Sequence, residues 1–197
     1  MSRRSFFDIA ALFVCVSVPL WFLWTLQPNE TVLITLVLAA AWVDFKTRHI
    51  PNWIPVSGAV CGMIFQVWQN GLPGALACIA GAALGMAIFL PLYILGGMGA
   101  GDVKLFTAVG TLVGPQALVL VFVLTGLLGG IAAGMLALRR GCLRQTLRKT
   151  GDLMMELGRM HWQEARATAT GAGPEALRLP YGAVIAGGTL LSLIVRH

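Results

Sequence analysis

The sequence predicts an all-α fold, a polytopic bundle of six or seven transmembrane helices. Its composition is the first reason: 57% of the 197 residues are hydrophobic and 11% are charged, whereas a soluble domain carries about 25% charged residues. The mean hydropathy of +0.81 is the second reason. The third is that the apolar residues form long runs, several of them close to the roughly 20 helical residues that cross a bilayer.

Each predicted helix is one of these apolar runs. The first, fourth and sixth runs are long enough to cross the hydrocarbon, whereas the second, third and seventh are marginal. The fifth is too short alone, so we expect it to begin inside the membrane or to be re-entrant. We therefore bracket the crossings at six or seven and favour seven. In chain order the runs span roughly residues 6–26, 31–43, 54–69, 75–95, 103–113, 116–138 and 180–195.

The chain is predicted to be one unit. No linker or low-complexity segment divides it, so we expect a single membrane domain over residues 1–197. The run at 6–26 follows Arg3 and Arg4 and lacks an A-x-A-like cleavage site. It is therefore expected to be a retained anchor and not a signal peptide.

Basic residues predict the orientation of the bundle. Arg3 and Arg4 place the N-terminus in the cytoplasm, and seven crossings then put every Lys and Arg except Arg196 on that side. Membrane orientation is the better explanation of the net charge of +6 than a nucleic-acid partner. Nucleic-acid binding is not expected, because the basic residues lie between apolar spans and not in one patch. The loops that become cytoplasmic are 44–53, 96–102 and 139–179.

The segment 139–179 is expected to be cytoplasmic and partly an amphipathic surface helix. Its apolar residues recur at roughly helical spacing with basic residues between them, which suits the anionic inner surface of a membrane. A docking surface for a substrate or a pilus-assembly partner is the alternative. The apolar positions are Leu143, Leu147, Met154 and Leu157.

Three pairs of glycines predict close helix packing. Each pair has the form G-x-x-x-G, which places both glycines on one helical face and lets a neighbouring helix approach closely in lipid. We expect contacts within the bundle and not a dimer. The pairs are Gly58 with Gly62, Gly81 with Gly85, and Gly130 with Gly134.

Two aspartates, Asp44 and Asp102, are the first candidate reactive groups, predicted at the same membrane face. Ionisable groups at the edge of the hydrocarbon are costly and usually face a bundle interior or a water-filled cavity. Asp44 alone could simply be an interfacial residue that ends its helix. Asp102 follows Gly97, Gly99 and Gly101, and alternating glycines let the backbone bend and another chain come close. A flexible loop is the simpler alternative for these glycines.

The residues around both aspartates resemble a known family. GAGDVK, residues 99–104, resembles the GxGD motif of intramembrane aspartyl proteases in the form seen in type IV prepilin peptidases. DFKTRHIPN, residues 44–52, is similar to the other signature of that family, and the two motifs stand in the family's order. The resemblance covers about residues 30–138. LPYG, residues 179–182, also resembles the family's C-terminal segment.

The resemblance implies an aspartyl endopeptidase that removes the leader peptide of prepilin or pilin-like precursors at the cytoplasmic face. Asp44 and Asp102 would form the catalytic dyad and share a proton, because two close carboxyls cannot both ionise easily. Lys46 and Lys104 could support the site, or could be snorkelling anchors. The supporting residues implied are Gly97, Gly99, Gly101, Lys46, Lys104, Pro51 and Asn52, with Pro180, Tyr181 and Gly182 from the C-terminal motif.

The cysteines bear on the subtype. Four isolated cysteines form no C-x-x-C pair, so we expect no metal site and no other cofactor. Larger members of the resembled family carry an N-terminal domain with two such pairs, associated with N-methylation. Because the first apolar run starts at about residue 6, we expect the short peptidase-only form of Flp (tight-adherence) pilus systems, without N-methyltransferase activity.

The resemblance places the protein in the bacterial inner membrane, with many crossings. Its expected partners are the prepilin-like substrate, membrane lipid and the pilus-assembly machinery, and not nucleic acid. Two alternatives remain at this stage. One is a small ion or proton-coupled transporter that uses Asp44 and Asp102 as a relay, and the other is a non-catalytic membrane scaffold.

Overall fold

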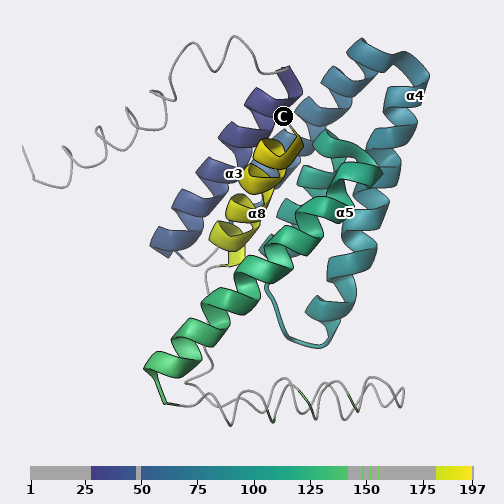
Figure 1. The fold of residues 1–197 in the computed structure, drawn as a ribbon. Coiled ribbons are helices and arrows are strands. Elements are labelled where there is room, and N and C mark those ends of the chain that lie inside the picture. The colour runs from purple at the N-terminus through teal and green to yellow at the C-terminus, as the bar shows by residue number, and fades with distance from the viewer. Residues whose placement is uncertain are drawn as a thin grey trace, which may run out of the picture.

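The computed structural model describes residues 28–47, 50–141, 148, 151, 155 and 181–196. This part holds four helices and no strand, which confirms the all-α prediction for it. The predicted run at 6–26, and residues 139–179 apart from the few just given, lie outside the described residues. The helices form one bundle in which α8 packs against α3 and α5 (Figure 1). They are α3 (Pro28–Thr47), α4 (Trp53–Ile94), α5 (Ala100–Arg139) and α8 (Tyr181–Arg196).

The two long helices each fold back on themselves into a pair of limbs (Figure 1). The helical geometry of α4 is interrupted at Gly71 (φ 60°, ψ −138°), and that of α5 at Gly114 (φ 74°, ψ 172°). Positive φ angles of this kind favour glycine, which has no Cβ to clash. Pro115 follows at once and suits the first turn of the resumed helix, because proline needs no backbone N–H partner there.

The prediction of six or seven spans is not supported. Within the described residues, two helices, α4 and α5, are long and apolar enough to cross a membrane, and α8 is a shorter apolar helix. The tight bends are the physical reason for the difference. A single glycine reverses the chain without a polar loop, so two predicted runs join into one helix of 42 residues in α4 and one of 40 in α5.

Small residues bring α4 and α5 into backbone contact. The Gly81 backbone packs so closely on the Gly110 carbonyl that neither position has room for a Cβ, and a Cβ at Gly85 would lie 3.1 Å from the Phe106 oxygen. Gly62 likewise packs on Thr111, because a Cβ at Gly62 would lie 2.9 Å from the Thr111 Oγ1. Close approach of this kind is how helices associate in lipid, where no hydrophobic force drives them together.

Two of the three predicted glycine faces make interhelical contacts. Gly81 and Gly85 pack on α5, and in the other pair Gly62 packs on α5 while Gly58 packs on Leu36 of α3. The third face, at Gly130 and Gly134, meets open space in the part of the chain that the structure describes. Sequence spacing identifies a face that permits close packing, but a second helix must lie against it before the glycines are used.

The bundle is apolar both inside and outside. Its centre is a buried cluster in which the Phe89 and Phe106 rings stack with centroids 4.0 Å apart. Large apolar side chains also stay exposed on the outer surface, such as Phe45 (76%), Trp68 (80%) and Leu72 (74%). A soluble monomer rarely exposes so many large apolar side chains. Such a surface suits contact with lipid.

A buried glutamine bridges the two bends. Gln66 of α4 donates from Nε2 to the carbonyl oxygen of Leu112 at 3.0 Å, two residues before the interruption at Gly114 in α5. A bend leaves backbone groups without their helical partners, and an apolar environment offers them no water. The Gln66 side chain supplies the missing donor.

We predict that Gln66→Leu destabilises the folded protein by about 1–3 kcal/mol, because it leaves the Leu112 carbonyl without this partner in a buried position. Thermal unfolding of the detergent-solubilised variant would measure the effect. Gln116→Leu is the matched control, because Gln116 lies beside the same bend and is exposed, so its loss should cost less. Equal melting temperatures for the wild type and Gln66→Leu would contradict this account of the bends.

Candidate active site

Three helix ends meet at the end of the bundle opposite the two bends (Figure 1). The C-terminal turn of α3 carries Asp44, and the first turn of α5 carries Asp102. The first turn of α8 contributes Gly182, whose N–H contacts Asp44. Both carboxylates are buried, at 6% and 9% exposure. The structure therefore gathers the two predicted aspartates and the C-terminal motif in one place.

Asp44 is held by the start of α8. The Gly182 N–H donates to Oδ2 of Asp44 at 2.9 Å in a buried position. A Cβ at Gly182 would lie 2.9 Å from this oxygen and 3.0 Å from the Asp44 Cβ, so only glycine allows the contact. Helix N-termini stabilise negative charge through their free N–H groups. The arrangement thus suits an ionised carboxylate at Asp44.

Asp102 caps its own helix and also lies close enough to Asp44 for their charges to interact. The Gly99 N–H donates to Oδ2 of Asp102 at 3.3 Å, and the Asp102 N–H donates to the Gly99 carbonyl at 3.1 Å. This is the return half of a capping box, and it satisfies a free N–H at the helix start. The carboxyl is also close enough to Asp44 for the two charges to repel. A pair of this kind favours one shared proton, which is what acid–base chemistry requires.

The glycine run before Asp102 ends α4. Gly97 donates to the Leu92 carbonyl and Gly96 to the Tyr93 carbonyl, both at 2.9 Å, the pattern of a Schellman motif. Gly96 has φ 79° and is the residue that requires glycine for its conformation. Sequence reasoning missed Gly96 and emphasised Gly97. The signal that could have found it is a glycine directly after the last apolar residue of a helix.

Gly101 allows a close contact, but with Ile50. A Cβ at Gly101 would lie 3.1 Å from the Ile50 Cβ and 3.4 Å from its carbonyl oxygen. Ile50 is buried at 3% exposure and precedes Pro51 and Asn52. The segment after α3 therefore packs directly on the first turn of α5. Gly99 has an extended backbone (φ −80°, ψ 150°) that other residues adopt as readily, but a Cβ there would lie 3.2 Å from the Asp102 Oδ2, to which the Gly99 N–H donates.

The two lysines of the motifs differ in their surroundings. Lys104 donates from Nζ to the Asn52 Oδ1 at 2.9 Å, which joins the aspartate motif of α3 to that of α5. Asn52 is the N-cap of α4, but its side chain makes no cap bond and is used for Lys104 instead. Lys46 is exposed, and its Nζ lies 4.7 Å from the centroid of the Trp42 ring. Pro51 accepts from the Ile54 N–H at 3.2 Å and shapes the start of α4.

The C-terminal motif is placed in part. Pro180 lies outside the described residues, whereas Tyr181 and Gly182 begin α8. The Tyr181 side chain is half-buried, and its hydroxyl is close enough to Asp102 to feel the charge of that carboxyl. Both described residues of the motif therefore adjoin the aspartates.

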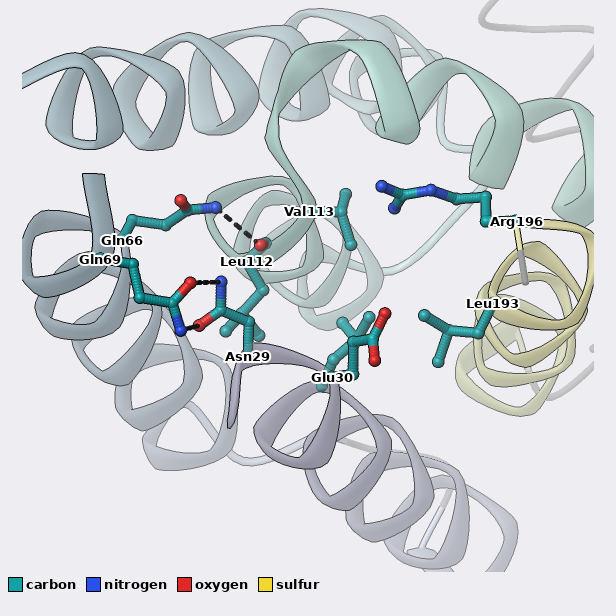
Figure 2. A pocket seen from close by; sticks show the side chains of 9 residues that line it. Asn29, Glu30, Gln66, Gln69, Leu112, Val113, Leu193 and Arg196 are labelled. Atoms are coloured by element: carbon teal, nitrogen blue, oxygen red, sulfur yellow. Dashed lines mark hydrogen bonds between the residues drawn. The ribbon is translucent and has the colours of Figure 1, made fainter. Parts of the chain in front are cut away.

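A cavity of about 200 Å³ lies at the other end of the bundle (Figure 2). Its polar side chains largely satisfy one another: Asn29 and Gln69 exchange two hydrogen bonds, at 3.2 and 3.1 Å. Gln66 supports the bend of α5 from the same wall. We assign this cavity a structural role at the bends. It is lined by Asn29, Glu30, Leu33, Gln66, Gln69, Leu112, Val113, Leu193 and Arg196.

We predict that Lys104→Met and Asn52→Leu each reduce stability by about 0.5–1.5 kcal/mol, because each removes the same hydrogen bond. The double variant should be little worse than either single one, since residues that share one interaction are not additive. Thermal unfolding of the four proteins gives the coupling. Lys46→Met serves as the control cation on the same end of the bundle. Fully additive losses would remove this link between the motifs.

Comparison with known families matches residues 31–134, more than half of the chain, to the type IV leader peptidase family. The matched range contains Asp44, Asp102 and Lys104 and ends before α8. Neither the curated proteins nor the solved structures gave a significant match. On this match, and with two apolar helices long enough to span a bilayer, the chain is a membrane protein that belongs to the type IV leader peptidase family.

Proposed function

We propose that the protein is a membrane-embedded aspartyl endopeptidase that removes the leader peptide of prepilin or pilin-like precursors, with Asp44 and Asp102 as its catalytic dyad. One observation carries the proposal: two buried aspartates from distant parts of the chain meet where α3 ends and where α5 and α8 begin. Membership of a leader peptidase family supports a peptidase acting on a prepilin-type substrate.

The dyad provides both halves of peptide hydrolysis. The ionised carboxylate accepts a proton from water as the water oxygen attacks the scissile carbonyl carbon, and the protonated carboxyl donates to the carbonyl oxygen. Collapse of the tetrahedral intermediate breaks the C–N bond, and a dyad proton passes to the leaving amine. Each aspartate accepts a backbone N–H at a helix N-terminus, Asp44 from Gly182 and Asp102 from Gly99, so both are suited to carry the single negative charge of the pair. No cluster of three metal-ligating side chains occurs among the described residues, and the proposed chemistry needs none.

We propose seven crossings for the whole chain. The limbs on either side of Gly71 and Gly114 match the predicted runs, so each long helix contributes two crossings. Together with α3, α8 and the run at 6–26, this makes seven crossings. Arg3 and Arg4 before the first run favour a cytoplasmic N-terminus. The C-terminal ends of α3 and α5 carry Lys46 and Arg139 on the side of the dyad. The positive-inside rule then puts the dyad at the cytoplasmic face of the inner membrane.

A prepilin fits this placement. Its apolar helix would lie in the bilayer against the exposed apolar side chains of the bundle, and its short basic leader would stay at the cytoplasmic interface. Residues 1–197 are proposed to form one peptidase domain, with 139–179 as a cytoplasmic segment that rests on the membrane or meets the pilus-assembly machinery. The sequence has no C-x-x-C pair, so we propose a peptidase without N-methyltransferase activity, of the Flp pilus kind.

The apolar side chains in the interior of the bundle argue against a relay for ions or protons. Along α3, the residues between Glu30 and Asp44 that face the core are apolar, including Leu33, Val37 and Ala40. On α3, therefore, apolar side chains lie between the polar cavity and the aspartates, and on α8 the buried hydroxyls of Thr189 and Ser192 donate to carbonyls of their own helix. A relay needs a continuous polar path, and a peptidase needs access from one side only.

We predict that Asp44→Asn and Asp102→Asn each reduce leader removal by at least about 10⁴-fold, because an amide can neither accept the proton from water nor share one. The double variant should be no worse than either single one, since a dyad acts as a unit. Co-expression with a candidate prepilin, followed by a mobility-shift assay, measures the loss.

Glu30→Gln is the matched control for this series, because it removes a carboxylate at the opposite end of the bundle. It should cleave at the wild-type rate. Membrane accumulation of all variants should be equal. Leader removal near the wild-type rate by either single Asn variant would exclude that aspartate from the mechanism.

We predict opposite accessibility for the two ends of the bundle. In a background without native cysteines, Gln116→Cys beside the bend of α5 should react with an impermeant thiol reagent on intact cells. Lys46→Cys, which is exposed at the dyad end, should react only after the cells are opened. The reverse pattern would overturn the proposed orientation.

A further inference from the structure

Tyr181 adjoins both candidate catalytic carboxyls. It is the first residue of α8, and the N–H of the next residue binds Asp44 at 2.9 Å. Its own side chain is half-buried, and its hydroxyl feels the charge of Asp102. The residue is thus tied to one aspartate through the backbone and lies near the other through its side chain.

The Tyr181 hydroxyl makes no hydrogen bond with the described residues. Several buried hydroxyls of the bundle are satisfied locally: Thr111, Thr189 and Ser192 each donate to a carbonyl of their own helix at 2.6 to 2.7 Å, whereas the buried Thr125 hydroxyl has no partner among the described residues. A phenol stands too far from its own backbone for such a bond. Because a phenolic O–H both donates and accepts, the site holds an unused donor beside the dyad.

The position of this donor is fixed by tight packing. The contact of Gly182 with Asp44 leaves no room for a Cβ, and at the next turns of α8 the Gly188 backbone packs against Thr125 of α5 without room for one either. Helix α8 is therefore tightly packed against α3 and α5 at both of these glycines. Donors held in place before the reaction stabilise a developing charge most effectively, because they need no reorganisation.

We propose that Tyr181 is a third catalytic side chain, whose hydroxyl donates a hydrogen bond to the carbonyl oxygen of the scissile peptide bond. As water adds to the carbonyl carbon, this oxygen gains negative charge, and the phenol stabilises it together with the protonated aspartate. The inference rests on the proposed peptidase function. Tyr181 lies outside the range matched to the family, residues 31–134, and its catalytic role is inferred from its place at the start of α8 beside the aspartates.

Tyr181→Phe is the direct test, because it removes the hydroxyl and keeps the ring. Steady-state cleavage of a prepilin peptide should show kcat lowered on the order of 10²-fold, with KM little changed and an unchanged melting temperature. Tyr93→Phe is the matched control: Tyr93 is the other of the two tyrosines in the sequence and is exposed at the end of α4. It should cleave as the wild type does.

A second pair of variants tests the placement of the residue. Gly182→Ala adds a Cβ against Asp44 and should lower kcat, whereas Gly187→Ala on the same helix meets only the flexible end of Leu128, at 3.1 Å, and should not. A wild-type kcat for Tyr181→Phe overturns the inference, and so does a loss of kcat matched by a loss of melting temperature. Full cleavage by Asp102→Asn would instead overturn the proposed function itself.

Discussion

In hydrocarbon, each backbone N–H and C=O must find its partner inside the protein, because no water is there to supply one. This requirement shapes the places where the helices of this bundle are interrupted. The bend of α5 is accompanied by the bond from Gln66 to the Leu112 carbonyl, and α4 ends in a Schellman motif whose N–H groups return to the last turn. The glycines at these points allow the chain to reverse and leave few polar groups unpaired.

The same requirement places the carboxylates. The free N–H groups at the starts of α5 and α8 need acceptors, and Asp102 and Asp44 supply them. Each candidate catalytic side chain therefore also completes a helix end, so its position is set by the backbone and not by its own rotamer alone. A functional pair built on helix termini is held more rigidly than one built on loops, which suits chemistry that depends on the distance between two acids.

Glycine has a different physical role at each point of the site. Gly96 supplies a positive φ, Gly101 allows Ile50 to approach, and Gly182 allows Asp44 to approach. Gly99 contributes its N–H and leaves room for the Asp102 carboxylate, since a Cβ there would lie 3.2 Å from Oδ2. Substitutions at these positions are therefore expected to fail for different reasons: strain at Gly96, and steric displacement of a neighbour at Gly101 and Gly182.

The sequence by itself determined the all-α class, the apolar runs, the two aspartate motifs and the family, because hydrophobic runs and short motifs are local properties of a chain. It also predicted which faces of α4 allow close packing. It predicted a break in each of α4 and α5 but not that a single glycine, Gly71 or Gly114, makes the reversal, since a tight bend and a short loop leave similar gaps between apolar runs. Only the tertiary structure decided which residues adjoin the dyad. The contacts of Gly182 with Asp44, Lys104 with Asn52, and Gly101 with Ile50 join residues far apart in the chain, and no local pattern encodes which distant surfaces will meet.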